Sequence, residues 1–263
     1  MRTFNHNYPS DITREQYEVI REELEYTKRK TKPREIDLYS VFCAILYMIK
    51  GGIQWNMIPS DFPDRGIVRY YYDKWSRERE GGTILSNVLN KLVTIHRNGE
   101  LRKDKTTLGI IDAQSVQNSD VAEEKGYDAG KKNGIKRHIV VDSQGLPHAI
   151  LVTTANITDR QGAIEMITLN LENLSQVKKF LVDGGYTGKP FATVIAQLCG
   201  AKVEVVKRDE LHKFVVLPMR WVVERTFGWL DKARRLWKNC ERSLHNALQM
   251  TILALVSVLI RRF

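Results

Sequence analysis

The 263-residue sequence predicts an α/β protein in which an all-helical region precedes a mixed β-sheet. Two observations predict it. Residues 1–104 carry apolar side chains at helical spacing, separated by turn-forming segments. From residue 105 onward, short β-rich runs alternate with amphipathic stretches. A chain of this length can bury one large core or two smaller ones. We therefore expect a helical domain at 1–104 and a sheet-containing domain at 105–263.

Four helices are expected in the first domain. Ser10-Asp11-Ile12-Thr13 resembles a helix start, and Gly51-Gly52 resembles a helix end. The turn-rich segment "IQWNMIPSDFPDRG" separates the second helix from the third. The predicted helices span about 13–28, 37–50, 66–79 and 83–97.

The second domain begins with three closely spaced strands, at about 106–116, 135–142 and 149–155, which predicts an antiparallel meander. Helices and strands then alternate. They are expected as helix 159–173, strand 178–183, helix 189–199, strand 202–208, a long helix from Pro218 to about 238, and a closing helix at 247–260. This order of elements is that of the ribonuclease-H-like fold, a five-stranded mixed sheet with flanking helices.

Composition narrows the class of protein. Lys plus Arg number 41 against 31 Asp plus Glu, a net charge of +10, which favours an anionic partner, nucleic acid before acidic lipid. The three cysteines lie far apart, which predicts reduced core residues in a cytosolic protein. The first residues lack an apolar signal core. The apolar run at 247–260 is shorter than the ~18 to 20 residues of a membrane span, so we expect a buried helix.

Two acids end apolar strands. Asp112 follows "GII" and Asp183 follows "FLV". In a ribonuclease-H-like sheet the first and fourth strands are neighbours, so both carboxylates should lie at one edge. Two carboxylates there repel each other, and a divalent cation removes the repulsion; oxygen ligands suit Mg²⁺ or Mn²⁺. Alternatively, each acid merely caps a turn, at "DAQS" and before Gly184-Gly185.

A third acid is expected on the long helix after the fifth strand. Glu224 lies at the edge of its apolar stripe, and Arg220 and Arg225 flank it in positions that suit phosphates. The alternative is a surface pair between Glu224 and Arg220. The stripe comprises Val222, Val223, Thr226, Phe227, Trp229, Leu230, Ala233, Leu236 and Trp237. Together the three acids predict a two-metal phosphoryl-transfer site, and the glycines after Asp183 would let metal and DNA approach the backbone.

Long motifs around these acids resemble the DDE transposases of bacterial insertion sequences, of the insertion-sequence-five type. "IDAQSV" is similar to the motif of the first Asp, "LVDGGYTG" to that of the second, and "RWVVERTFGWLDKARRLWKNCER" to that of the Glu. "GYDAGKKNGIKRHIVVDSQG" and "TTANITDRQGA" resemble the intervening segments, and "GGIQWNMIPSDFP" and "KWSR" the N-terminal domain. The resemblance covers nearly the whole chain.

The resemblance implies DNA cleavage and strand transfer at the ends of a mobile element. It implies Mg²⁺ at Asp112, Asp183 and Glu224. Related transposases often carry a Tyr three residues before the Arg and a Lys seven residues after the Glu. This chain has Leu217 and Asp231 at those positions, and Lys232 or Arg235 are the candidate replacements for the Lys.

A basic, glycine-containing segment at 125–137 would join the first two strands beside the predicted site. Lys131, Lys132, Lys136 and Arg137 are its candidate contacts to a phosphate backbone. The alternative is a solvated hairpin. We expect the neighbouring His138 to be a sheet or core residue rather than a ligand.

The helices at 37–50 and 66–79 predict a helix-turn-helix-like unit. Arg65, Arg69 and Lys74 would face DNA, while Val68, Tyr72 and Trp75 pack inward. A plain helical core with a charged face would show the same pattern.

The sequence therefore predicts a transposase that cuts at insertion-sequence ends and joins them to target DNA with two Mg²⁺ ions, Mn²⁺ being possible. Its partners would be double-stranded DNA, both terminal inverted repeats and target, and a second copy of the chain in a homodimer or larger assembly. It would act in the bacterial cytoplasm, on the nucleoid, without a membrane. The alternatives are a catalytically silent DNA-binding protein derived from a transposase, and a general nuclease of the same fold.

Overall fold

The computed structural model describes residues 4–25, 35–127, 133–206 and 220–263. Contacts divide the chain into two compact units. The first comprises Met1–Leu92, Trp229–Trp237 and Gln249–Phe263, and the second comprises Val93–Gly228 and Lys238–Leu248. By contact, two segments near the C-terminus thus group with the helical unit, whereas the sequence suggested a single division at residue 104.

The four helices expected before the sheet are present. They are α1 (Arg14–Glu25), α2 (Leu38–Gly51), α3 (Arg65–Ser76) and α4 (Ile84–Gly99). Asp37 caps α2 by accepting from the backbone N–H of Tyr39 at 3.1 Å. The predicted inward-facing residues of α3, Val68, Tyr72 and Trp75, are buried. Short 3₁₀ turns η1 (Trp55–Met57) and η4 (Arg234–Leu236) also belong to this unit.

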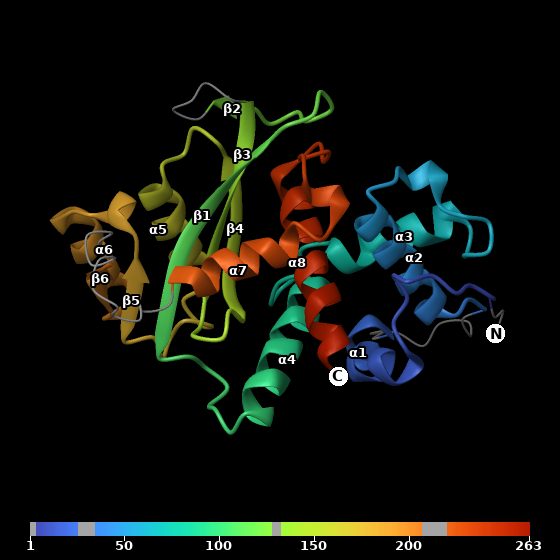
Figure 1. The fold of residues 1–263 in the computed structure, drawn as a ribbon, viewed down its shortest axis with the longest axis horizontal. Coiled ribbons are helices and arrows are strands. Elements are labelled where there is room, and N and C mark those ends of the chain that lie inside the picture. Colours follow the sequence, from blue (N-terminus) through green and yellow to red (C-terminus); the bar gives the residue numbers. More distant parts are fainter. Residues whose placement is uncertain (1–3, 26–34, 128–132, 207–219) are drawn as a thin grey trace. The chain divides into compact units, whose positions relative to one another are not determined.

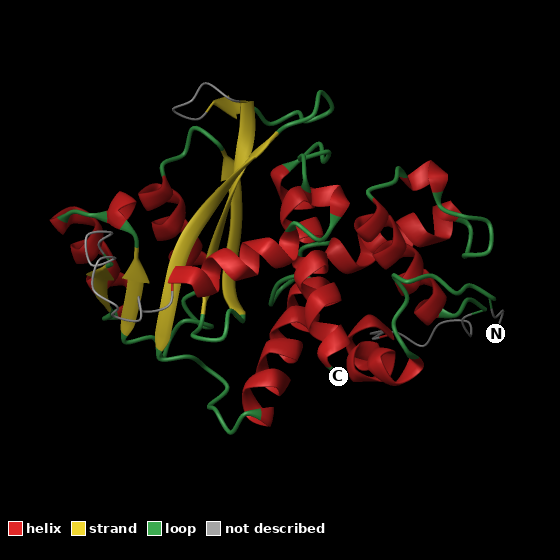
Figure 2. Cartoon of the chain, viewed as in Figure 1, coloured by secondary structure: helices red, strands yellow, loops and turns green. Residues whose placement is uncertain are grey.

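The second unit is built on a mixed sheet (Figures 1 and 2). Strands β1, β3 and β4 form the antiparallel meander, and β5 and β6 add to β1 in parallel. The five predicted strands are all present, and the two-residue β2, which pairs with β3, was not predicted. The strands are β1 (Leu108–Gln117), β2 (Gly126–Tyr127), β3 (Asn133–Val141), β4 (Pro147–Thr154), β5 (Lys179–Val182) and β6 (Lys202–Val205).

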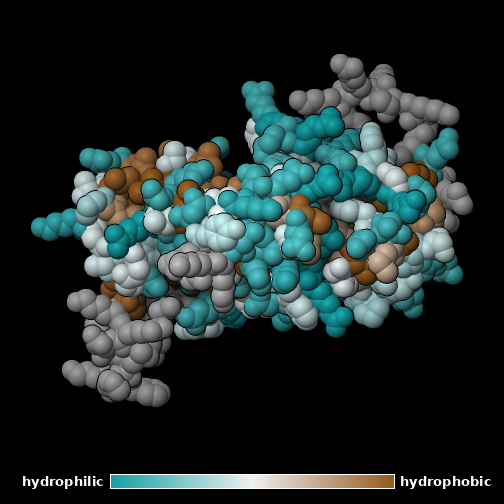
Figure 3. Space-filling model, turned by 90° about the horizontal axis from the view of Figure 1, so that it is seen from above, coloured by the Kyte–Doolittle hydropathy of each residue, from teal (hydrophilic) through white to brown (hydrophobic). Residues whose placement is uncertain are grey.

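Helices cover both faces of this sheet. On one face, α5 (Asp159–Leu169) and α6 (Lys189–Cys199) pack on Ile111, Val140, Phe180 and Val182. On the other face, the first turn of α8 (Leu244–Leu259) packs on Val116, Ile135 and Val152. The part of α7 (Arg220–Leu230) in this unit lies across that second face (Figure 1). Its Val223 lines a pocket together with Ile110 and Leu181. The apolar side chains are thereby mostly interior, and the face seen in Figure 3 is largely hydrophilic.

Two helix predictions need correction. The helix expected to run to residue 238 ends at Leu230, and Trp237, predicted on its apolar stripe, is 62% exposed; Pro218 and Leu217 lie outside the described residues. The closing helix is also longer than the predicted 247–260, because α8 begins at Leu244 and the 3₁₀ turn η5 (Ile260–Arg262) extends its other end. Leu244–Arg262 is long and apolar enough to cross a membrane by length and composition, but 61% of its apolar window is buried within the protein. The predicted burial is confirmed.

His138 is a sheet residue on β3, as predicted. Its ring is fully buried, and its Nε2 lies 2.9 Å from Oγ1 of Thr153. Burial lowers the pKa of His138 to about 4, because the charged imidazolium is poorly solvated there. Gly162 of α5 sits directly on the ring, and a Cβ on this glycine would lie 2.2 Å from His138 Nε2.

We predict that Gly162→Ala lowers the free energy of unfolding by about 2 kcal/mol. The added methyl group overpacks the sheet–helix interface, and this cost exceeds the ~1 kcal/mol that Ala gains over Gly in a helix. The matched control is Gly228→Ala in α7, where a Cβ meets nothing within 4 Å. This control should be neutral or stabilising. Urea unfolding of both variants measures the difference. Equal stability of the two variants would show that the His138 ring is not rigidly held.

Candidate active site

Strands β1 and β5 run side by side in the sheet (Figure 1). A pocket lies where their pairing ends. Asp112 and Asp183 both line it, although they are far apart in the sequence. The remaining lining residues are apolar: Ile110, Ile111, Leu181, Val182, Val206 and Val223. The two acids predicted to meet at one edge of the sheet therefore share one pocket with a largely apolar wall.

Strand register explains this meeting. The parallel pairing of β1 and β5 has Gly109 opposite Phe180 and Ile110 opposite Leu181. Each acid lies two residues beyond the last pair. Because side chains alternate between faces, Asp112 points to the same face as Ile110, and Asp183 to the same face as Leu181.

The sequence suggested that Asp112 ends its strand, and this prediction was wrong. It lies in the middle of β1, which continues to Gln117 because β3 pairs with it along that whole length. Only the pairing with β5 stops before Asp112. The apparent end of the strand at Asp112 is therefore the place where the pairing with β5 has ended, while the pairing with β3 continues.

Backbone N–H groups orient both carboxylates. Asp112 Oδ1 accepts from the N–H of Ala113 at 2.8 Å, and Asp183 Oδ1 accepts from the N–H of Gly185 at 2.8 Å. Asp183 thereby caps the 3₁₀ turn η2 (Gly184–Tyr186). A Cβ on Gly185 would lie only 3.0 Å from that oxygen, so this glycine permits the close approach of the carboxylate to the backbone.

Tyr186, the last residue of η2, is buried in the apolar cluster beneath α5 and α6. Its hydroxyl is a buried atom without a hydrogen-bond partner among the described residues. Burial raises the pKa of Tyr186, and the negative charges of Asp112, Asp159 and Asp183 raise it further. Three carboxylates therefore act on one buried phenol. The carboxylates of Asp112 and Asp183, which line the pocket, are suitable ligands for a cation.

Glu224 comes from α7, which crosses the face that bears the pocket. Val223, the residue before it, is buried and lines the pocket, whereas Glu224 itself is exposed. Within the described part of the chain, Asp112, Asp183 and Glu224 do not form a set of three whose ligand atoms all lie within 4.8 Å of one another. The site thus consists of two neighbouring aspartates and a third acid on an adjoining helix.

The turn between β3 and β4 anchors α7. Thr226 Oγ1 donates to the carbonyl oxygen of Gly145 at 3.0 Å, and Arg225 Nη2 donates to that of Gln144 at 2.6 Å. Arg225, predicted as a phosphate contact, thus binds protein backbone and also lies over the ring of Trp221. The side chain of Arg220 is outside the described residues. The helix that carries Glu224 is therefore positioned by this turn.

Asp142, which was predicted only as the last residue of a strand, organises the same turn. Its Oδ1 accepts from the N–H groups of Gln144 and Leu146, and its Oδ2 is paired with Arg97 and lies 3.5 Å from Nε2 of His148. Burial alone would raise the pKa of Asp142, but the bonds and charge from His148 and the two N–H bonds outweigh it and lower the pKa. The feature of the sequence that could have identified Asp142 is an acid at the end of an apolar strand.

Two of the candidate DNA contacts in the basic segment at 125–137 are strand residues. Lys136 and Arg137 lie within β3, in agreement with the strand predicted at 135–142. Arg137 is 2% exposed and donates to Gln114 Oε1, so it offers no surface to DNA here. Lys136 pairs with Asp159 at 2.8 Å. Lys131 and Lys132 lie outside the described residues.

The basic residues of the helical unit differ in their contacts. Arg65 is exposed at the start of α3. Arg69 pairs with Asp73 at 2.9 Å and lies over the ring of Trp55, and Lys74 lies 5.7 Å from the ring of Tyr71. In the same unit Arg235, one candidate for the missing Lys, donates to the carbonyl oxygen of Ile53.

Comparison with known proteins gives concordant matches. The family described as "Transposase DDE domain" matches residues 103–259, and the family "Putative transposase of IS4/5 family" matches residues 12–81. The chain is also similar to a protein named "Putative transposase for insertion sequence element IS402" from Burkholderia cepacia. The two are 32% identical over 123 residues, which are 43% of this chain and 58% of that protein. The match thus spans less than two thirds of the relative.

We predict that Asp142→Asn lowers the free energy of unfolding by about 3 kcal/mol or more at neutral pH, because it leaves the buried Arg97 without its counter-charge. The folded pKa of Asp142 is below its ordinary value of 3.8, so its carboxylate stabilises the protein above that pH and loses this effect as the pH falls through the folded pKa. The difference between the two proteins should therefore shrink below about pH 4.

Urea unfolding from pH 7 to pH 3 measures this difference. The control is Glu204→Gln, which removes the exposed pair between Lys179 and Glu204 and should cost less than about 1 kcal/mol. A loss as small for Asp142→Asn would refute the organising role of Asp142.

Proposed function

Because this chain belongs to the transposase DDE domain family, we propose that it is the transposase of a bacterial insertion sequence. It cuts DNA at the ends of its element and joins those ends to target DNA. The observation that carries the proposal is the shared pocket of Asp112 and Asp183 at the β1–β5 edge. Glu224, on the helix next to that pocket, completes the three acids.

The donor set fits a hard divalent cation. Asp112 and Asp183 are half-buried carboxylates that backbone N–H groups orient into one pocket, and oxygen donors of this kind suit Mg²⁺, with Mn²⁺ as a substitute. We propose that these two residues and Glu224 hold two ions. When bound, the ions would activate a water or 3′-hydroxyl and stabilise the leaving 3′-oxygen.

The residues of the chain contribute positioning and charge. The apolar wall of Ile110, Leu181 and Val223 limits the access of bulk water to the carboxylates. The link from α7 to the turn at Gly145 keeps Glu224 on the side of the pocket. The net charge of +10 attracts the DNA phosphates.

We propose that the helical unit reads the terminal inverted repeats. Arg65, exposed at the start of α3, is the best-placed candidate, because Arg69 and Lys74 contact neighbouring side chains. Lys131 and Lys132 remain candidates for contacts to the flanking or target duplex. Pairing of two ends calls for a homodimer or a larger assembly, acting in the bacterial cytoplasm on the nucleoid.

One observation favours a second function, a transposase-derived DNA-binding protein without cleavage. Among the described residues, the three acids do not converge within 4.8 Å as a set, and Glu224 is exposed. A chain in which α7 stayed in this position on DNA would bind the ends without cutting them.

We predict that Asp183→Asn or Glu224→Gln lowers the rate of nicking at least about a hundredfold, because each removes a charge that stabilises the transition state. The substrate is a plasmid that carries the gene with its native flanking DNA, incubated with Mg²⁺ or with EDTA. Asp120→Asn, an exposed acid away from the pocket lining, is the matched control and should cut as the parent does.

Metal-dependent cuts at discrete flanking positions, lost in Asp183→Asn and kept in Asp120→Asn, are the expected result. Binding to the flanks without cuts, in Mg²⁺ and in Mn²⁺, would replace the proposal with the silent DNA-binding protein. Scattered cuts without preference for the flanks would indicate a general nuclease.

A further inference from the structure

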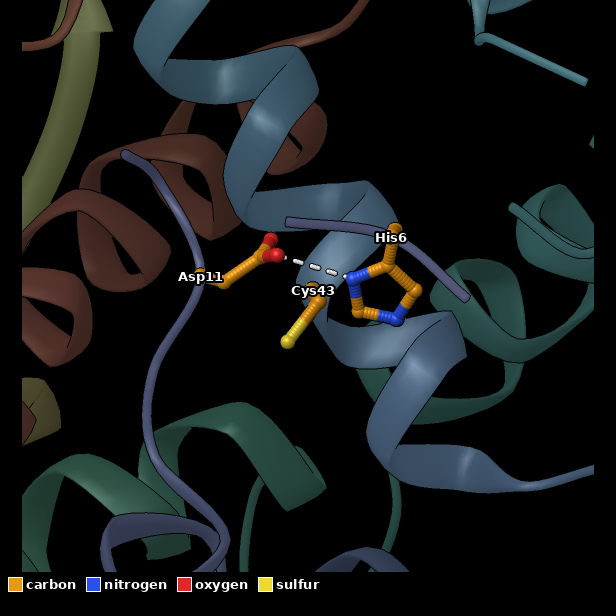
Figure 4. Close-up of side chains that lie close together, drawn as sticks. All are labelled: His6, Asp11 and Cys43. Carbon is orange, nitrogen blue, oxygen red and sulfur yellow. Dashed lines mark hydrogen bonds and ion pairs between the residues drawn. The ribbon is translucent and has the colours of Figure 1, made fainter. Parts of the chain in front are cut away.

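A second cluster of metal-ligating side chains lies in the helical unit, apart from the three acids. His6, Asp11 and Cys43 each offer one ligand atom, and these atoms all lie within 4.8 Å of one another. Figure 4 shows His6 and Asp11, from the N-terminal segment, facing each other beside Cys43 of α2. His6 Nδ1 and Asp11 Oδ2 are 2.8 Å apart. Three different kinds of donor therefore meet at one point.

These side chains are buried but not fully satisfied. The side chains of His6 and Asp11 are 2% and 13% exposed, and Cys43 is 0% exposed. His6 Nε2, Asp11 Oδ1 and the neighbouring Ser10 Oγ are buried atoms without a hydrogen-bond partner among the described residues. Buried polar atoms without partners are costly and rare. Three such atoms lie in or beside this set of ligands, and a bound group would give them partners.

Two guanidinium groups lie near this cluster, and each bonds another group. Arg14 pairs with Asp37 at 2.6 Å, and Arg261, whose charge also acts on Asp11 and Cys43, donates to the carbonyl oxygen of Ser10. Asp11 Oδ2 lies against His6 Nδ1 and also accepts from the backbone N–H of Tyr8 at 2.9 Å, and the Cys43 side chain is buried beside them. With a divalent ion, a thiolate and a carboxylate would balance its charge.

We propose that His6, Asp11 and Cys43 form a structural site for a divalent transition-metal ion of the zinc class. An imidazole nitrogen, a carboxylate oxygen and a thiolate sulfur are the donors that Zn²⁺ takes. Binding releases the Cys43 thiol proton to solvent and leaves His6 neutral. A water completes the fourth position. The ion fastens the segment before α1 to α2, and this role is independent of the proposed catalytic metals and of DNA.

The test is a Co²⁺ titration of the full-length, tag-free chain after treatment with a chelator. The protein carries Asp183→Asn, so that ions at the pocket contribute as little as possible. A thiolate-to-cobalt charge-transfer band that saturates at about one equivalent and disappears on addition of Zn²⁺ is expected, because only a cysteine ligand produces this band. Absence of the band would overturn the proposal and leave His6 and Asp11 as a buried ion pair.

Variants assign the band to its ligands. Cys43→Ala should abolish it, whereas the matched control Cys199→Ala, at a partly buried free cysteine, should keep it. His6→Gln, which leaves the α2 core intact, should weaken Co²⁺ binding at least about tenfold and remove the rise in Tm that Zn²⁺ gives the parent. A band that survives Cys43→Ala, or a Zn²⁺-dependent rise in Tm that survives His6→Gln, would overturn the assignment.

Discussion

The parallel pairing of β1 with β5 is the constraint on which the candidate active site depends. Ile110 lies opposite Leu181, and this register carries Asp112 and Asp183 to the same face two residues later. A shift of one residue in either strand would turn one acid to the opposite face, where α5 and α6 pack. The apolar cluster around Phe180 and Val182 on that opposite face holds the register.

The length of each strand matters as much as its register. β5 stops at Val182 because Asp183 folds back to cap η2, while β1 continues along β3. The pairing of β1 with β5 therefore ends at Ile110, and the pocket that Asp112 and Asp183 line lies just beyond that pair. The third acid depends on another contact, since α7 is held by the β3–β4 turn that Asp142 and Arg97 organise.

Charge is distributed less simply than the composition suggests. The surplus of Lys and Arg favours a nucleic-acid partner, but several of these side chains stabilise the fold instead. Arg137 is buried on the face of the sheet that α7 and α8 cover, and Arg97 is paired with Asp142 in the interior. The helical unit likewise contains two kinds of arginine. Arg65 is exposed, whereas Arg69 is paired with Asp73. Counts of charge indicate the class of partner, and burial decides which residues can meet it.

The sequence by itself determined the order and type of the elements, the mixed sheet and the pairing of the strands that bear Asp112 and Asp183. Hydrophobic periodicity and turn residues are local properties, and the order of elements restricts the topology. Tertiary structure decided where α7 ends, which acid sits in mid-strand, that Asp142 organises a buried network, and that His6 and Asp11 meet Cys43. These features depend on contacts between segments far apart in the chain, which no local pattern encodes.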